Sequence, residues 1–159
     1  MIRVVHYISK SLRSIVHPWA IVGGANLLLR GCSSGANDID IVSTSQGVSG
    51  IASLLQSKTH DGPKWTESTT IKSFFFVANI EGVKLEVMGD PVNYIGGTWL
   101  ANSQWMESIE YISVSGFIVP LTTLTYELRI NSELQNLERV EIIKECMTSG
   151  LKSERAPRG

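Results

Sequence analysis

Residues 20–31 read AIVGGANLLLRG and residues 37–42 read NDIDIV, and these two stretches decide the expected fold. The first begins as a short apolar strand, turns at Gly23 and Gly24, and continues as a helix. The small, polar segment that follows predicts a loop. The second stretch alternates acidic and apolar residues, which is the pattern of a half-buried strand. A strand, a glycine turn, a helix and a second strand therefore follow one another in a short part of the chain.

The glycine pair lies where a strand passes into a helix. Gly23 and Gly24 let the backbone turn sharply and approach a ligand closely. The helix that follows offers unpaired N–H groups, which form a natural seat for phosphate. An ordinary structural turn would contain the same residues, so both interpretations stay open for this pair taken alone.

Two carboxylates alternate on the second strand. Asp38 and Asp40 point to one face, because successive side chains of a strand alternate, and Ile39 and Ile41 point into the core. Like charges side by side repel unless a cation bridges them. Oxygen ligands suit Mg²⁺ or Mn²⁺, so the pair predicts a divalent metal site. The alternative is a solvated strand face that carries two incidental acids.

A third acid is expected on a β-hairpin. Residues 71–80 are rich in aromatic and β-branched side chains, residues 81–82 form a tight turn, and residues 83–88, VKLEVM, return as a strand. Glu86 stands between two apolar neighbours and therefore faces away from them. It is either a further metal ligand or an exposed strand carboxylate.

The rest of the chain adds helices and short strands to this centre. Helices are predicted at residues 5–16, at residues 48–55 with Ser45 as the N-cap, and from residue 121 onward, and strands at 19–22, 38–42 and 109–119. The hairpin is expected to end at Asp90–Pro91. The late helices carry an apolar stripe of Leu134, Leu137, Val140, Ile143 and Met147. This order predicts an α/β (α+β) fold, a small mixed sheet flanked by helices, in a single domain of residues 1–159 with a core at about 19–119 and a helical tail at about 121–150.

Bulk composition is ordinary for a globular protein. The chain has 159 residues, 43% of them hydrophobic, and a net charge of −1, which argues against a long nucleic acid as partner. Cys32 and Cys146 are too few and too far apart for a disulfide framework or a zinc site, so we predict plain small residues in a reducing compartment. No signal peptide or transmembrane helix is expected, and the predicted location is the cytoplasm.

Taken together, the three segments resemble the DNA polymerase β-type nucleotidyltransferase superfamily. The similarity is to its small stand-alone members, as found in minimal nucleotidyltransferases and in toxin–antitoxin pairs. It covers the catalytic core, whereas the later helices are only loosely similar. The resemblance implies a nucleotidyltransferase fold with C-terminal helices.

The resemblance also implies a role for each motif residue. Gly23 and Gly24 would hold the triphosphate, and Asp38 and Asp40 would bind two divalent ions. Glu86 would share a metal and help to activate the incoming hydroxyl. In such two-metal transfer one ion lowers the pKa of the attacking hydroxyl and the other steadies the leaving pyrophosphate.

One departure from the family lies in the loop before the second strand. Many small relatives carry an arginine and a threonine there, where this chain has Ser34 and Ala36. The change removes a planar cationic clamp for phosphate. Arg30, or a lysine such as Lys84, is a candidate substitute, and the Ser34 hydroxyl is a candidate ligand for a phosphate oxygen.

The expected activity is transfer of a nucleoside monophosphate from a nucleoside triphosphate such as ATP to a hydroxyl, with release of pyrophosphate. The acceptor would be a protein side chain, an RNA end or a small molecule such as an aminoglycoside. The alternative is a catalytically weakened nucleotide-binding or regulatory module with a protein partner, as in a toxin–antitoxin pair. A nucleotide-sugar glycosyltransferase also uses Asp-x-Asp, but it needs neither the upstream glycine pair nor Glu86.

Overall fold

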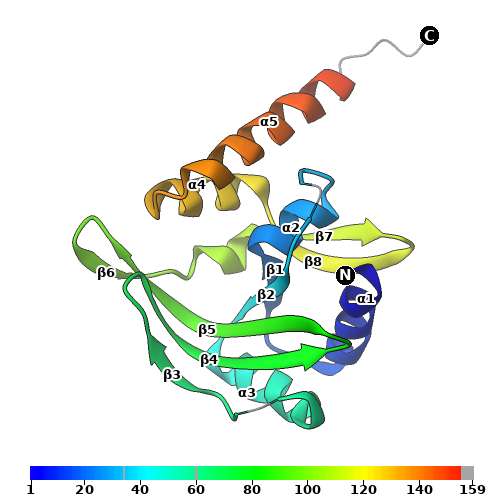
Figure 1. Ribbon diagram of the computed structural model, residues 1–159, viewed down its shortest axis with the longest axis vertical. Helices are drawn as coiled ribbons and strands as arrows, with labels where there is room; N and C mark the ends of the chain where they lie inside the picture. Colours follow the sequence, from blue (N-terminus) through cyan, green and yellow to red (C-terminus); the bar gives the residue numbers. More distant parts are fainter. Residues whose placement is uncertain (34, 60, 155–159) are drawn as a thin grey trace.

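The computed structural model describes residues 1–33, 35–59 and 61–154, and it contains an open mixed sheet with helices on its faces (Figure 1). Helices and 3₁₀ turns are α1 (Ile2–Ser11), η1 (Leu12–Ser14), α2 (Gly23–Leu29), α3 (Ser45–Leu54), η2 (Gln56–Lys58), η3 (Gln104–Ser108), α4 (Leu124–Glu133) and α5 (Leu137–Glu154). Strands are β1 (Trp19–Val22), β2 (Asp38–Ser43), β3 (Lys64–Glu67), β4 (Ile71–Ile80), β5 (Val83–Ile95), β6 (Thr98–Ala101), β7 (Ile109–Val114) and β8 (Phe117–Thr122). The predicted α/β class, with a mixed sheet and C-terminal helices, is confirmed.

The sheet order is β3-β4-β5-β2-β1-β8-β7, with β6 added to the far half of β5. At its centre β2 runs antiparallel to β1 and parallel to β5. Alternation along β2 divides its residues between two hydrophobic clusters, one on each face. Ile39 and Ile41 join the cluster that α1 and α3 cover. Val42 packs on the other face with η3 and α4, so Asp38 and Asp40 also belong to the α4 face.

Several predicted boundaries are wrong by a few residues. The glycine pair does not form a separate turn, because α2 begins at Gly23 itself, which has a φ of +68°. The cap of α3 is Thr44, whose side chain accepts a hydrogen bond from the Gly47 N–H, and Ser45 is the first helical residue. The predicted helix from residue 121 begins later, because β8 extends to Thr122. Each shift moves an element end and leaves the element type unchanged.

The hairpin does not stop at Asp90–Pro91 as predicted. Strand β5 continues to Ile95, and beyond Pro91 it exchanges its pairing with β2 for pairing with β6. Asp90 adopts φ +46°, and its carboxylate accepts a hydrogen bond from the backbone N–H of Ser45. Strands β3 and β6 are short, exposed additions that the residue pattern did not indicate.

The apolar stripe predicted on the late helices is only partly correct. Val140 and Ile143 are buried on α5, but Leu137 is 70% exposed. Leu134 lies between the two helices, at the C-cap of α4. The core-facing side of α5 is therefore short, although the helix extends to Glu154. Among the described helices, none is long and apolar enough to cross a membrane.

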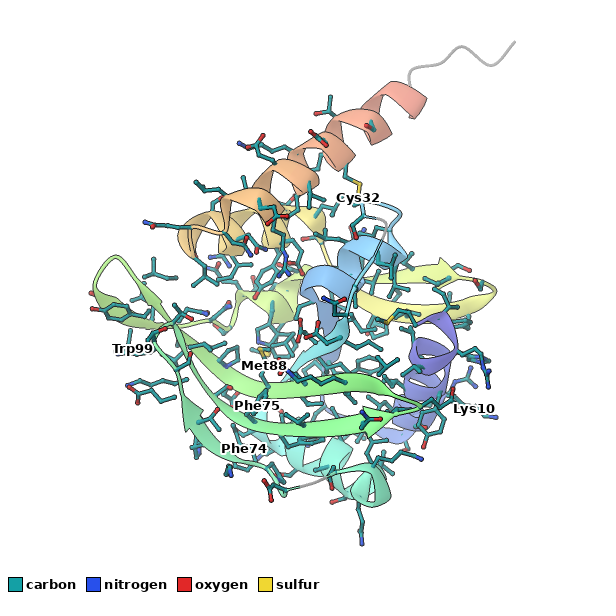
Figure 2. The ribbon with its side chains drawn as sticks, in the orientation of Figure 1. Lys10, Cys32, Phe74, Phe75, Met88 and Trp99 are labelled. Atoms are coloured by element: carbon teal, nitrogen blue, oxygen red, sulfur yellow. A yellow bond between two sulfur atoms is a disulfide. The ribbon has the colours of Figure 1, made fainter. Side chains whose placement is uncertain are left out.

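Cys32 and Cys146 form a disulfide, which corrects the prediction that they are plain separate residues. Cys32 lies just after α2 and Cys146 lies on α5, 114 residues later in the chain, with Cα atoms 5.2 Å apart. Figure 2 labels Cys32 where the loop after α2 meets α5. The bond therefore ties the C-terminal helix to the glycine-pair helix.

We expect this disulfide to stabilise the fold. Reduction, or the double substitution Cys32→Ser, Cys146→Ser, should lower the free energy of unfolding by about 2–4 kcal/mol, because the bond closes a long loop in the unfolded chain. Urea denaturation with and without dithiothreitol measures the effect. Equal midpoints for the oxidised and reduced protein would contradict it, and the double variant should not respond to dithiothreitol.

Candidate active site

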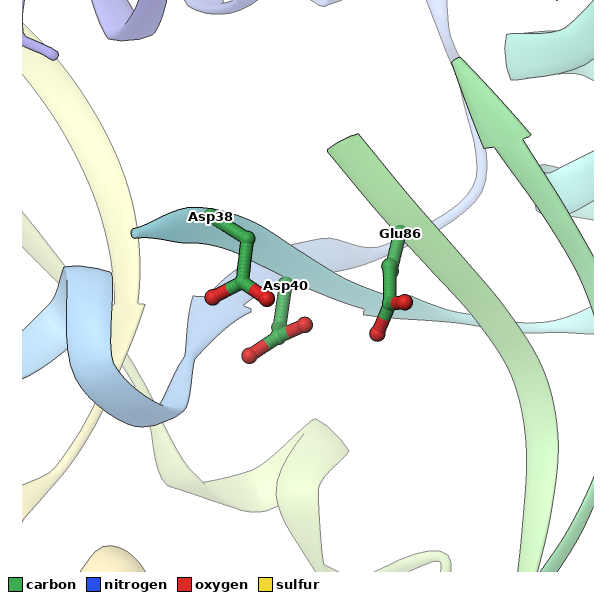
Figure 3. A group of neighbouring side chains, drawn as sticks. All are labelled: Asp38, Asp40 and Glu86. Carbon is green, nitrogen blue, oxygen red and sulfur yellow. The ribbon is translucent and has the colours of Figure 1, made fainter. Parts of the chain in front are cut away.

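Three carboxylates meet on the α4 face of the sheet. Parallel pairing sets Asp40 opposite Glu86, and strand alternation brings Asp38 to the same face as Asp40. Figure 3 shows the three side chains projecting to one side from β2 and β5. One carboxylate oxygen from each residue lies within 4.8 Å of the others. The structure thus brings together the three acids that the sequence singled out.

The electrostatics of this triad centre on Asp40. Burial and the neighbouring charges of Asp38 and Glu86 raise the pKa of Asp40 from its ordinary 3.8 to about 7. A hydrogen bond with Glu86 acts in the same direction, and the positive charge of Arg139 opposes it. Near neutral pH the site therefore accommodates either a proton or a cation between the acids. Oxygen donors at this spacing fit a divalent ion such as Mg²⁺ or Mn²⁺.

The two cations suggested as replacements for the missing loop arginine have other partners. Arg30 donates hydrogen bonds to Asn26 and to the Thr122 carbonyl and pairs with Glu110, so it joins α2 to the β7–β8 edge. Lys84 pairs with Glu86, and this hydrogen bond raises the pKa of Lys84. Ser34, the other candidate in this loop, lies outside the described residues.

The phosphate seat expected at the glycine pair holds a carboxylate from α4. Glu127 is 1% exposed, and its Oε1 accepts a hydrogen bond of 3.0 Å from the Gly23 N–H. The same oxygen accepts from Asn26 Nδ2 at 3.0 Å and from Thr122 Oγ1 at 2.6 Å. Glu127 therefore places a negative charge at the start of α2, where the helix dipole favours one. Sequence reasoning missed it, because an acid in the first turn of a helix is common on protein surfaces.

Arg139, on α5, is the second residue that sequence reasoning missed. Its guanidinium nitrogens lie 3.4 Å from the position that a Cβ atom would occupy at Gly23 and 3.7 Å from the corresponding position at Gly24. Its charge also reaches Asp40, as the effect on the Asp40 pKa shows. In the primary sequence it is one of many charges in a polar helix, and only the packing of α5 brings it to the site.

A cavity of about 170 Å³ adjoins the triad on the same face. Its walls include Asp40 and the apolar side chains of Val42 and Met88, the next residues along β2 and β5 on this face. Figure 2 labels Met88 in the space between β5 and the helices. Asn93, 2% exposed, contributes a buried Oδ1 that has no hydrogen-bond donor among the described residues. Tyr126 also lines the cavity, and burial raises its pKa to about 12, so its hydroxyl keeps its proton.

Solved structures share this fold. A protein from Thermotoga maritima described as a nucleotidyltransferase is 23% identical, with a TM-score of 0.79 over 93% of this chain and 92% of the other. The factor ANT(2'')-Ia in complex with adenylyl-2''-tobramycin is 13% identical, with a TM-score of 0.56 over 98% of each chain. The lincosamide antibiotic adenylyltransferase LnuA, bound to lincomycin, is 11% identical, with a TM-score of 0.61 over 92% of this chain and 98% of the other.

Sequence comparison assigns the family. No curated protein matches the chain. The profile of the aminoglycoside-2''-adenylyltransferase family, however, matches residues 4–142, which include every strand and the start of α5. The resemblance inferred from the glycine pair and the three acids is thereby confirmed at the level of the nucleotidyltransferases. The protein belongs to the aminoglycoside-2''-adenylyltransferase family, as a small nucleotidyltransferase-like member.

Proposed function

We propose that this protein transfers a nucleoside monophosphate from a nucleoside triphosphate to a hydroxyl group of a small molecule. The observation that carries the proposal is the convergence of Asp38, Asp40 and Glu86 within 4.8 Å beside a cavity. Family membership supports the reaction class. ATP is the proposed donor, because two of the structures named above point to adenylyl transfer: LnuA is described as an adenylyltransferase, and ANT(2'')-Ia holds an adenylylated antibiotic.

The donor set fits Mg²⁺ or Mn²⁺, which when bound would supply acidity to the acceptor hydroxyl and neutralise charge on the leaving pyrophosphate. Asp38 and Asp40 would bind both ions, and Glu86 would complete the set and orient the acceptor hydroxyl. The register of β2 and β5 holds these three groups in place before any ligand arrives. Catalysis would then come mainly from positioning and charge neutralisation.

The cavity next to Asp40 is the proposed acceptor site. It is too small for a folded protein surface, and apolar residues such as Val42, Met88 and Ile130 line it. The unpaired Asn93 oxygen could accept a hydrogen bond from a bound acceptor, and the protonated Tyr126 hydroxyl could donate one to it. These walls favour a compact acceptor with apolar surface and a few hydroxyl or amide groups. An antibiotic is one such class, consistent with the acceptors in the structures of ANT(2'')-Ia and LnuA.

A second candidate function is a nucleotide-binding or regulatory module with weak turnover and a protein partner, as in a toxin–antitoxin pair. The observation that favours it is the contact between Glu127 and the Gly23 N–H. A buried carboxylate there repels a triphosphate and occupies a donor that phosphate would use. The Gly23 amide becomes available to a phosphate only if Glu127 moves away.

Two further proposals concern the domain organisation and the cellular location of the protein. We propose that residues 1–159 act as one nucleotidyltransferase domain, in which α4 and α5 cover the active face of the core. We further propose a cytoplasmic location, where nucleoside triphosphates are available. In that compartment the Cys32–Cys146 disulfide would be exposed to cellular thiols.

The first test removes the metal ligands without changing shape. In the double variant Asp38→Asn, Asp40→Asn, Mg²⁺-dependent ATP binding should become undetectable by calorimetry, because amides hold a divalent cation poorly. Glu86→Gln should retain ATP binding but release pyrophosphate about 10²–10⁴-fold more slowly, the range for loss of a positioned proton-transfer group. Asp61→Asn, at an exposed loop position, is the matched control and should behave as wild type. Unchanged binding in the double variant would exclude the triad as the metal site.

Metal binding should depend on pH through Asp40. Its folded pKa of about 7 exceeds the ordinary 3.8, so the folded protein binds a proton that the unfolded chain releases. Without metal, stability from this group therefore falls as pH rises from about 4 to 7. Mg²⁺ competes with that proton, so the rise in Tm caused by Mg²⁺ should be larger at pH 8 than at pH 5.5. Differential scanning fluorimetry measures it, and Asp40→Asn should abolish the pH dependence.

The acceptor site is tested at Asn93. Replacing it with leucine keeps the number of side-chain heavy atoms and removes an unpaired buried oxygen, so the fold should be about as stable. The KM for the acceptor should nevertheless rise about tenfold, the cost of one lost hydrogen bond in a buried site. The KM for ATP should stay unchanged. An acceptor KM that does not change would place the acceptor elsewhere, and steady-state kinetics with a panel of hydroxylated antibiotics provides the measurement.

A further inference from the structure

We propose that Arg139 is the phosphate-binding cation of this site, and that the Cys32–Cys146 disulfide holds it there, so that triphosphate affinity depends on the oxidation state of the two cysteines. The inference rests on the proposed function, because it concerns the same nucleotide. It adds a ligand-binding residue from α5 and a means of control. Neither the residue nor the means of control follows from the carboxylate triad alone.

The position of Arg139 suits a phosphate group. Its guanidinium lies beside the backbone of Gly23 and Gly24, at 3.4 and 3.7 Å from their would-be Cβ positions. The Asp40 Oδ2 atom lies 3.1 Å from that same point at Gly23. A triphosphate that shares metal ions with Asp40 would therefore come within reach of the guanidinium. A planar group with several donors matches phosphate oxygens in pairs.

Unlike Arg30 and Lys84, Arg139 is available to bind an anion. In the part of the chain that the structure describes, no hydrogen bond or ion pair engages its guanidinium. Arg30 and Lys84, by contrast, are held by Glu110 and Glu86. Ser34 and Ala36 stand where the resemblance of the sequence leads us to expect an arginine and a threonine. Arg139 therefore supplies the missing charge from a different element, the C-terminal helix.

The disulfide lies on the same side of α5 as Arg139. Seven residues separate Arg139 from Cys146, which is nearly two helical turns, so their side chains project in similar directions about 10 Å apart. The two residues contact opposite ends of α2. Arg139 adjoins Gly23 at the beginning of the helix, and Cys146 is bonded to Cys32 just beyond its end. The backbone N–H of Cys32 donates a hydrogen bond to the Leu27 carbonyl, which fixes the loop against the helix end.

Apart from the covalent bond, α5 packs mainly against α4. Among the α5 residues whose side chains the structure describes, the buried apolar ones are Val140 and Ile143, and Leu137 at the beginning of the helix is largely exposed. The short segment that connects α4 to α5 includes Gln135, which has a φ of +57°. In Figure 1 the second half of α5 extends away from the sheet. The disulfide is thus the anchor that keeps the Arg139 side of α5 against α2.

Reduction would release this anchor. A dithiol reductant transfers two electrons and two protons to the Cys32–Cys146 bond, giving two thiols and the oxidised, disulfide form of the reductant. Arg139 would then sample more positions, and ordering it on a phosphate would cost conformational entropy. Triphosphate affinity should therefore fall on reduction.

The test is a double-mutant cycle between Arg139 and the disulfide, read by calorimetric titration of ATP with Mg²⁺. We expect Arg139→Gln to weaken ATP binding about tenfold or more, the usual effect of losing a charged hydrogen bond, and Arg139→Lys to recover part of it. Dithiothreitol, or Cys32→Ser, Cys146→Ser, should weaken binding several-fold in wild type. Neither change should weaken it further in Arg139→Gln. Arg3→Gln, at a side chain that is 89% exposed, is the matched control.

Each contrary outcome has a separate meaning. Equal loss of affinity on reduction in wild type and in Arg139→Gln would overturn the coupling, because the disulfide would then act on the fold as a whole. Unchanged ATP affinity in Arg139→Gln, with tighter Mg²⁺ binding, would overturn the phosphate role and leave Arg139 as a counter-charge for the triad. No ATP binding by the oxidised wild type would overturn the proposed function itself, and the inference with it. Circular dichroism of each sample establishes that the variants and the reduced protein stay folded.

Discussion

Parallel pairing of β2 with β5 is the interaction on which the site depends. It sets Glu86 beside Asp40, and the alternation of β2 adds Asp38 on the same face. A shift of one residue in this register would turn Glu86 to the opposite face of the sheet, into the apolar cluster beneath α1 and α3. The apolar neighbours of each acid prevent such a shift, because they would have to leave that cluster. The hydrophobic core thus enforces a close approach of three acids that their own repulsion disfavours.

The two helices after the sheet bring groups of opposite charge to this site. Glu127 from α4 closes the beginning of α2 with hydrogen bonds, whereas Arg139 from α5 brings a positive charge toward Asp40. The same two residues border the place where a triphosphate would meet the glycine pair. One resists an incoming anion and the other attracts it. Under the proposed function, the relative placement of α4 and α5 on the core would set how strongly the site holds a nucleotide.

The cysteines show how far apart chemically linked residues can lie in a sequence. Cys32 and Cys146 are separated by 114 residues and satisfy no motif, which is why they were predicted to be independent. They meet because α5 folds back across the end of α2. A single bond between distant residues restrains the helix that carries Arg139, so it links the stability of the fold to the position of that side chain.

Local pattern by itself determined the central elements and the three acids. A period of two residues places Asp38 with Asp40 and turns Glu86 away from its apolar neighbours, and short-range rules suffice for such features. Tertiary structure decided the rest: the contact of Glu127 with Gly23, the approach of Arg139, the Cys32–Cys146 bond and the passage of β5 through Pro91. The passage of β5 through Pro91 depends on its pairing with β6, whereas the other three features depend on how helices that come late in the chain pack on the finished sheet. No local periodicity encodes that packing, because it arises from contacts between residues a hundred positions apart.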